Sequence, residues 1–345
     1  MIEVTRYHDD KLIGRWLLIC AVTIFGMILL GGVTRLTESG LSMVDWQPIM
    51  GVVPPLSTAD WVYLFEQYKL FPEYQLINKG MSLDEFKQIF WFEYLHRMLG
   101  RFIGLLFFFP LVTFLWMGKV HPRLKTHLFT LLILGGCQGL MGWYMVQSGL
   151  VDRPDVSQYR LTAHLGLAIA IYGYIVWLTI GLFSPGRVIR LGHASMTLSL
   201  VPLVYVMILS GGFVAGTNAG LSFPTWPLMG DSFIPPALYR DGVLSVFEQV
   251  TTIHFNHRML AYATGFILIS AALHGVLRSD DLRVRIASVL MMAAVTLQIV
   301  LGIGTVLSHV NVTIAAGHQS GAVVLLTTVL FWVHCKRSER APSSR

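Results

Sequence analysis

The chain has 345 residues, of which 54% are hydrophobic and only 13% are charged. Its mean hydropathy of +0.63 lies far above the range of soluble globular proteins and excludes an ordinary soluble enzyme. The formal net charge of +6 is better explained by basic loops that flank membrane spans than by a nucleic-acid partner.

Apolar runs near or above the ~18–20 residues that cross a bilayer as a helix recur eight times. They are joined by polar links, so we predict an all-α integral membrane protein of eight transmembrane helices. Ser82-Leu83-Asp84-Glu85 resembles a capping box, which predicts that the second helix begins there and runs unbroken to Met117. Ser157 and Asn311 are predicted N-caps of later helices. In chain order the predicted cores are Trp16–Val33, Phe102–Met117 (with a polar extension from Trp91), Leu128–Gln147, Leu161–Phe183, Ala194–Gly212, Phe255–Val276, Ile286–Leu307 and Val312–Val333.

Lysine and arginine residues predict the orientation of these helices. Fifteen of the 25 fall in the two termini and the even-numbered loops, whereas seven are spread over the longer odd-numbered loops. The positive-inside rule therefore puts both termini in the cytoplasm. No cleavable signal or transit peptide is recognisable, which favours a bacterial inner membrane. We expect the three cysteines to be inert thiols in or beside the spans, and the sequence contains no C-x-x-C-H motif for covalent attachment of a cofactor.

The two halves of the chain repeat one another. Gly31-Gly32 recurs 180 residues later as Gly211-Gly212, and the tetrapeptide His96–Leu99 recurs as His257–Leu260. Gln138 with Gly142 matches Gln298 with Gly302, and His164 matches His318. We predict two tandem four-helix bundles, residues 1–190 and 191–345, related by a pseudo-twofold axis along the membrane normal.

Four histidines stand at matched positions inside these spans: His96, His164, His257 and His318. A single intramembrane histidine can be no more than a hydrogen-bond partner between helices. Four at matched positions favour a functional site, because two imidazoles on facing helices can take both axial positions of a haem iron. The pattern predicts two porphyrins, with His96 and His164 at one iron and His257 and His318 at the other.

One matched position differs between the halves. Glu93 precedes His96 by three residues, whereas His254 precedes His257 by three residues. Residues at this spacing share one helix face, so we expect Glu93 beside the first porphyrin, where a carboxylate can move protons. We therefore assign the chemistry to the first half and the electron handling to the second half. The alternative is that Glu93 merely pairs with Arg97 at i, i+4.

Arg97 and Arg258 follow the first histidine of each pair. They either bind haem propionates or extend to the membrane interface as snorkelling side chains. His254 is either a hydrogen-bonding group beside the second haem or a plain interfacial residue. These three residues are candidate cofactor-binding residues.

The chain resembles the haem A synthases over nearly its whole length. The resemblance is carried by GGVTRLTESGLSMVDWQP, EYLHRMLGR, GGFVAGTNAGLSFPTWP, HFNHRMLAY and AAGHQSGA, in this order. It implies oxidation of the haem O methyl group to the formyl group of haem A, with the substrate in the first half and haem b in the second. It thereby implicates Glu93, His96 and His164 at the first site and His257 and His318 at the second. The outer loops lack the paired cysteines of some bacterial members, so the chain is similar to the cysteine-free branch with mitochondrial relatives.

The resemblance also implies partners: membrane lipid, a haem O synthase as donor, terminal oxidase assembly as the destination of the product, and an electron carrier of unidentified kind. The rival interpretation is a dihaem b-type electron-transfer cytochrome, linked to quinol and without a porphyrin substrate. A transporter with inverted repeats is a third class, but it predicts broken helices and an odd number of spans in each repeat.

Overall fold

The computed structural model describes residues 2–44, 50–150, 154–184 and 197–338. Within these ranges the chain is helical, and the only β pairing is an isolated bridge between Met229 and Ser232. Contacts divide the chain into two compact units, residues 22–168 and residues 1–21 together with 169–345. The helices α1 (Ile2–Leu36) and α6 (Gln158–Leu182) each contribute to both units.

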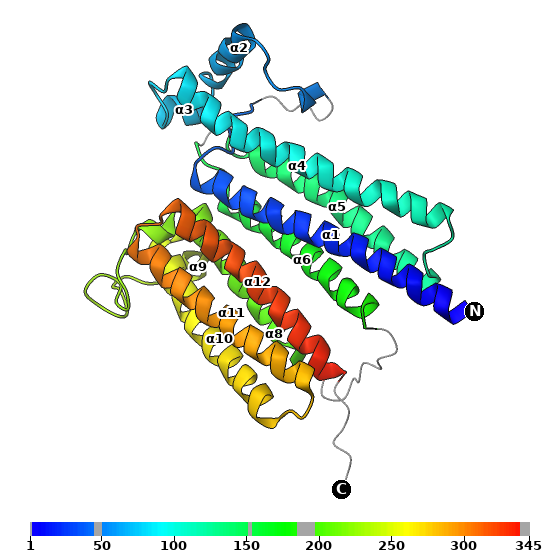
Figure 1. The fold of residues 1–345 in the computed structure, drawn as a ribbon. Coiled ribbons are helices and arrows are strands. Elements are labelled where there is room, and N and C mark those ends of the chain that lie inside the picture. The colour runs from blue at the N-terminus through cyan, green and yellow to red at the C-terminus, as the bar shows by residue number, and fades with distance from the viewer. Residues whose placement is uncertain (1, 45–49, 151–153, 185–196, 339–345) are drawn as a thin grey trace. The chain divides into compact units, whose positions relative to one another are not determined.

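The unit of residues 22–168 is built on two long helices, α4 (Leu83–Trp116) and α5 (Pro122–Gln147), which pack against each other (Figure 1). Ser82 caps α4, since its side chain accepts a hydrogen bond from the Glu85 backbone while the Glu85 carboxylate accepts one from the Ser82 backbone. The prediction of a second helix that begins at this capping box and ends at Met117 is confirmed. The segment before α4 forms the short elements η1 (Met50–Val52), α2 (Thr58–Tyr68) and α3 (Pro72–Leu76).

The other unit contains α8 (Leu200–Gly216), α10 (Val250–Arg278), α11 (Leu282–Leu307) and α12 (Val312–Arg337). α10 packs on α8 and α11, and α12 packs on α11 and α8 (Figure 1). The side-chain oxygen of Asn311 accepts hydrogen bonds from the first turn of α12, which confirms the predicted N-cap. Between α8 and α10 lie η2 (Ala219–Leu221), η3 (Gly242–Leu244) and α9 (Ser245–Glu248).

The chain is a membrane protein. Seven of the described helices are long and apolar enough to cross a bilayer, and α8 is a shorter apolar helix of 17 residues. These elements correspond to the eight predicted spans, although α4 begins well before the predicted core at Phe102. The start of the predicted span Ala194–Gly212 and the predicted boundary between residues 190 and 191 lie outside the described residues. The arrangement as two tandem bundles remains a prediction.

Candidate haem sites

Each of the four histidines stands on a different helix: His96 on α4, His164 on α6, His257 on α10 and His318 on α12. Within residues 22–168, His96 and His164 lie close enough for their protonated forms to repel each other. His257 and His318 are related in the same way within the other unit. All four side chains are only half-buried, so each ring retains surface that a ligand between the two partners can cover.

Each imidazole lies against a glycine of a neighbouring helix. These glycines are what allows the close approach, because a Cβ atom in their place would press on the ring carbon Cε1. The distance from such a Cβ to Cε1 would be 2.8 Å for Gly31 and His96, 3.0 Å for Gly142 and His164, 3.3 Å for Gly211 and His257, and 2.8 Å for Gly302 and His318. The backbone of the adjacent helix therefore restricts where each ring can stand.

The ring nitrogens have different polar surroundings. Nδ1 of His257 lies 2.8 Å from Oγ of Ser210, and the Gln138 amide lies 3.2 Å from Nδ1 of His164. In the described part of the chain, the buried Nδ1 atoms of His96 and His318 have no hydrogen-bond partner. Buried polar atoms are rarely left unpaired, so these two rings differ from those of His257 and His164, which have a polar neighbour at Nδ1.

The donor set fits a haem in each unit. A haem iron takes its two axial ligands from neutral imidazoles, and each unit brings two half-buried imidazoles together. The glycine contacts and the hydrogen bonds to the rings are the kind of outer contact that orients a metal ligand. His96 with His164, and His257 with His318, are therefore the residues that would hold the two iron atoms.

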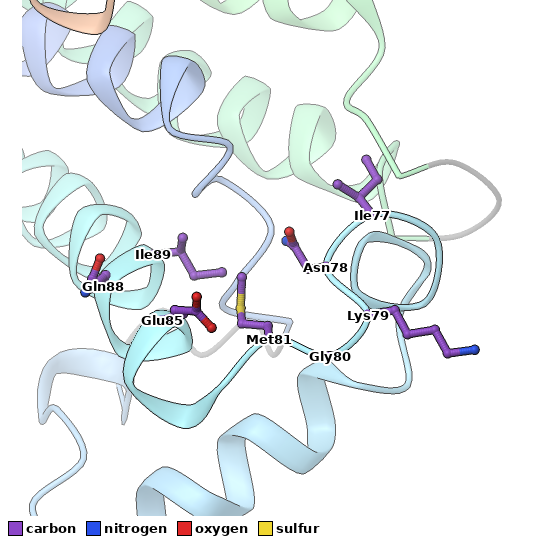
Figure 2. Close-up of a pocket in the computed structure, with 8 residues that line it drawn as sticks. All are labelled: Ile77, Asn78, Lys79, Gly80, Met81, Glu85, Gln88 and Ile89. Atoms are coloured by element: carbon purple, nitrogen blue, oxygen red, sulfur yellow. The ribbon is translucent and has the colours of Figure 1, made fainter.

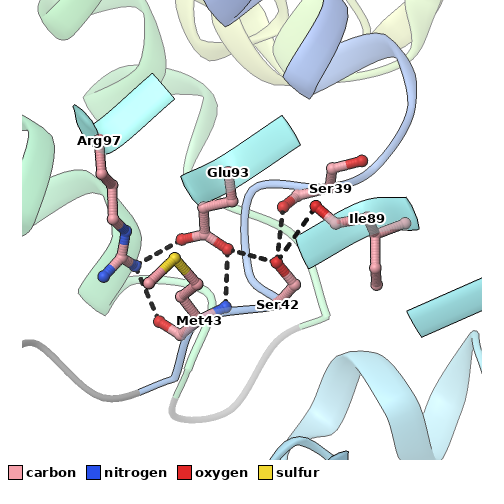
Figure 3. Close-up of polar contacts among 6 residues, drawn as sticks. All are labelled: Ser39, Ser42, Met43, Ile89, Glu93 and Arg97. Atoms are coloured by element: carbon pink, nitrogen blue, oxygen red, sulfur yellow. Dashed lines mark hydrogen bonds and ion pairs between the residues drawn. The ribbon is translucent and has the colours of Figure 1, made fainter. Parts of the chain in front are cut away.

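Glu93 is buried one helical turn before His96, with 3% of its surface exposed. Its Oε2 accepts hydrogen bonds from Oγ of Ser42 and from the backbone nitrogen of Met43, both at 2.7 Å (Figure 3). Its Oε1 pairs with Arg97, which also donates to the Met43 carbonyl oxygen. The segment after α1 thus holds Oε2, and Arg97 of α4 holds Oε1. The Glu93–Arg97 ion pair that the i, i+4 spacing allows is formed.

On α10, His254 and Arg258 stand where α4 has Glu93 and Arg97, and the segment after α8 contacts both of them. Arg258 is 7% exposed, and its Nη2 donates to the backbone oxygens of Thr225, Pro227 and Leu228. Its Nη1 is buried and has no hydrogen-bond partner within the described residues. His254 is 2% exposed, and its ring centroid lies 6.3 Å from that of Phe223. An imidazole thus replaces the carboxylate, and a guanidinium nitrogen remains available for an anionic group.

The first turns of α4 are covered by aromatic side chains. The rings of Phe65 and Phe86 stack with centroids 5.0 Å apart, and Trp61 meets Phe90 edge to face at the same distance. Beside this cluster, a shallow pocket of about 360 Å³ is lined by residues 77–81 together with Glu85, Gln88 and Ile89 (Figure 2). The Ile89 carbonyl oxygen lies 3.4 Å from Oγ of Ser42, so the wall of the pocket adjoins the Glu93 network.

A family model described as a cytochrome oxidase assembly protein (COX15-CtaA) matches residues 14–330. The chain belongs to this family. It is 48% identical to the protein named heme A synthase of Nitrosospira multiformis, over 95% of this chain and 94% of that relative. Heme A synthases of Nitrosomonas eutropha and Paramagnetospirillum magneticum are 45% and 46% identical, each over at least 94% of both chains.

Sequence reasoning selected the four histidines as candidate ligands but missed the groups that contact their rings. Ser210 carries no distinguishing sequence signal. The four glycines and Gln138 stood out only as markers of the internal repeat. These residues recur at matched positions in the two halves, as the histidines do. This shared recurrence was the signal that could have assigned them to the sites.

Proposed function

We propose that this protein is a haem A synthase, which oxidises the methyl group of haem O to the formyl group of haem A by successive hydroxylation. The observation that carries the proposal is the difference between the two histidine pairs. A buried carboxylate, Glu93, stands one turn before His96, whereas an imidazole, His254, stands one turn before His257. The names of relatives that match over at least nine-tenths of their length support the same assignment.

In the first half, His96 and His164 hold the substrate haem by its iron and so fix the plane of the porphyrin. Glu93 lies on the same face of α4 as His96 because the two are three residues apart. The oxidation releases protons together with the electrons that leave, and the Glu93 carboxylate accepts one of these protons. Ser42, Met43 and Arg97 keep that carboxylate in one position while the substrate turns over.

In the second half, His257 and His318 would hold the iron of haem b. When bound, haem b supplies a one-electron relay that takes electrons away from the oxidation. Arg258 would offer its unpaired Nη1 to a propionate of that haem, since a guanidinium pairs well with a carboxylate. His254 contributes a hydrogen-bonding ring near the same haem. Arg97, which already pairs with Glu93, serves the first site chiefly by holding that carboxylate.

The protein lies in a bacterial inner membrane with both termini in the cytoplasm, as the distribution of lysine and arginine favours. Haem O reaches it from a haem O synthase, because direct transfer spares a free apolar porphyrin. The haem A product goes to terminal oxidase assembly. An electron carrier of unidentified kind accepts the electrons.

Extraction of pigments from the purified protein tests the proposal. Haem b together with haem O or haem A supports the synthase. Haem b alone, in an amount that fills both sites, supports the dihaem electron-transfer cytochrome instead. Incubation with haem O and an electron acceptor then separates the two functions, since the synthase forms haem A and the cytochrome does not.

A further inference from the structure

Ser210 on α8 forms a polar contact with one of the histidines. Its Oγ lies 2.8 Å from Nδ1 of His257 on α10 and 2.7 Å from the backbone oxygen of Met207, one turn earlier on α8. The neighbouring Gly211 brings the two helices close, because a Cβ there would stand 3.3 Å from Cε1 of the same ring. Two consecutive residues of α8 therefore contact one edge of the His257 imidazole.

The hydrogen positions follow from the chemistry of the three groups. A backbone oxygen can only accept a hydrogen bond, and a serine hydroxyl has a single proton to give. When the Ser210 proton goes to the Met207 oxygen, the hydroxyl oxygen must accept from His257, so Nδ1 carries the ring proton. The other nitrogen, Nε2, then has a free lone pair, which is the form of imidazole that binds iron.

The first half lacks this arrangement. The repeat offset of 180 residues pairs Gly211 with Gly31 and Ser210 with Leu30. Gly31 makes the same close approach to His96, since a Cβ added there would stand only 2.8 Å from Cε1. Leucine cannot accept a hydrogen bond, and Nδ1 of His96 is buried with no partner in the described residues. The glycine is thus shared by the two repeats and the hydroxyl is specific to the second.

We propose that Ser210 is a positioning residue that fixes His257 in its iron-binding tautomer and so makes the second half a site of permanent haem retention. In the first half Leu30 stands in the equivalent place, so His96 lacks this hydroxyl, and the polar contact of that site is the one between Gln138 and Nδ1 of His164. This inference rests on the proposed assignment of haem b to the second half. Hydrogen bonds to the outer nitrogen of a ligating histidine commonly contribute about 10–100-fold to metal affinity.

The test compares Ser210→Ala and Ser210→Thr with Ser288→Ala as a control. Ser288 is a buried hydroxyl of the same unit, which accepts a hydrogen bond from Trp332 Nε1 rather than from a histidine. Purified proteins are compared by the rate of haem b transfer to excess apomyoglobin, by the reduction potential of haem b and by the low-spin electron paramagnetic resonance signal.

Ser210→Ala is expected to release haem b about tenfold faster or more. Its reduction potential should rise, because the hydroxyl no longer strengthens the imidazole as an electron donor. Ser210→Thr should restore both values, and Ser288→Ala should leave them at wild type. Wild-type behaviour of Ser210→Ala, or equal defects in the alanine and threonine variants, would overturn the inference.

A separate variant, His257→Ala, tests the underlying assignment of haem b to the second half. If His257→Ala keeps a full complement of six-coordinate haem b, haem b is not bound where we place it. If His257→Ala loses haem b while Ser210→Ala is unchanged, the assignment stands and only the role of Ser210 is wrong.

Discussion

The ring of His318 on α12 lies directly on the backbone of Gly302 on α11, and an added Cβ at that glycine would stand 2.8 Å from the ring carbon Cε1. The same contact joins His96 to Gly31 at the same distance. Real Cβ atoms essentially never approach another atom this closely, so the ring or the helix must move if either glycine gains a side chain. The position of each of these two candidate ligands is therefore set by the packing of neighbouring helices as well as by its own helix.

Gly302→Ala should displace the His318 ring and lower the haem b content of the purified protein. Overpacking of this kind costs about 1–3 kcal/mol, which corresponds to roughly 5–150-fold in affinity. The haem-to-protein ratio after dilution measures the effect. Gly304→Ala is the matched control, because a Cβ there meets Ile314 at an ordinary 3.4 Å. Equal haem content in the two variants would show that the glycine contact does not constrain the ligand.

Substitutions in the two histidine pairs should have different effects on haem b content and on haem A formation. His257→Ala and His318→Ala remove an axial ligand of haem b, so haem b becomes loosely bound or is lost and activity falls as a consequence. His96→Ala and His164→Ala should keep near-normal haem b while losing haem A formation. Absorption spectra and pigment analysis of the four variants measure both quantities. Loss of haem b from the first-half variants, with retention in the second-half variants, would reverse the assignment.

Glu93→Ala should leave the fold and haem b intact but stop or stall oxidation, because the second half has no carboxylate at this position. Glu93→Asp should be partly active. Glu93→Gln removes the negative charge but can still form hydrogen bonds, so it tests the two contributions separately. Rates of haem A formation, with haem b content as the reference, measure these effects. Normal haem A formation by Glu93→Ala would reduce the residue to a structural partner of Arg97.

Ser42→Ala distinguishes the chemical role of Glu93 from a purely structural one. It removes one hydrogen bond from the loop after α1 and leaves the carboxylate in place. We expect this variant to form haem A more slowly than wild type but to remain clearly active. If it is as inactive as Glu93→Ala, the loop contact rather than the carboxylate accounts for the defect.

The elements of the fold could be predicted from local sequence. Apolar runs predicted the spans, and the caps at Ser82 and Asn311 predicted two helix starts, because these signals lie within a few residues of one another. The capping box predicted that α4 begins well before its apolar core at Phe102, and a polar extension of that core was predicted from Trp91. Phe65 and Tyr68 of α2 pack against the first turns of α4. The hydropathy pattern of α4 by itself gives no sign of this contact.

The contacts around the candidate sites could not be predicted in this way. Ser42 and Glu93 are 51 residues apart, and Ser210 and His257 are 47 residues apart. Such pairs meet only after the helices have packed, so the sequence could indicate candidate ligands but not the groups that contact them.

Glu73 on α3 provides a prediction about pH. It is buried, with 5% of its surface exposed, and its Oε2 accepts a hydrogen bond from the Tyr68 hydroxyl at 2.8 Å. Burial is the main cause that raises the pKa of this carboxyl to about 8, and the nearby carboxylate of Glu93 adds to the shift.

Because the folded state favours the protonated form of Glu73, its contribution to stability is fully present below the unfolded pKa of 4.5 and is lost as the pH rises through about 8. Glu73→Gln should therefore flatten the decline of the melting temperature between about pH 5 and pH 8, measured by scanning fluorimetry in detergent. Glu66→Gln is the control, since Glu66 is an exposed carboxylate on α2 paired with Lys69, and screening by solvent makes such a pair weak. A decline as steep in Glu73→Gln as in wild type would show that another group governs the loss of stability at high pH.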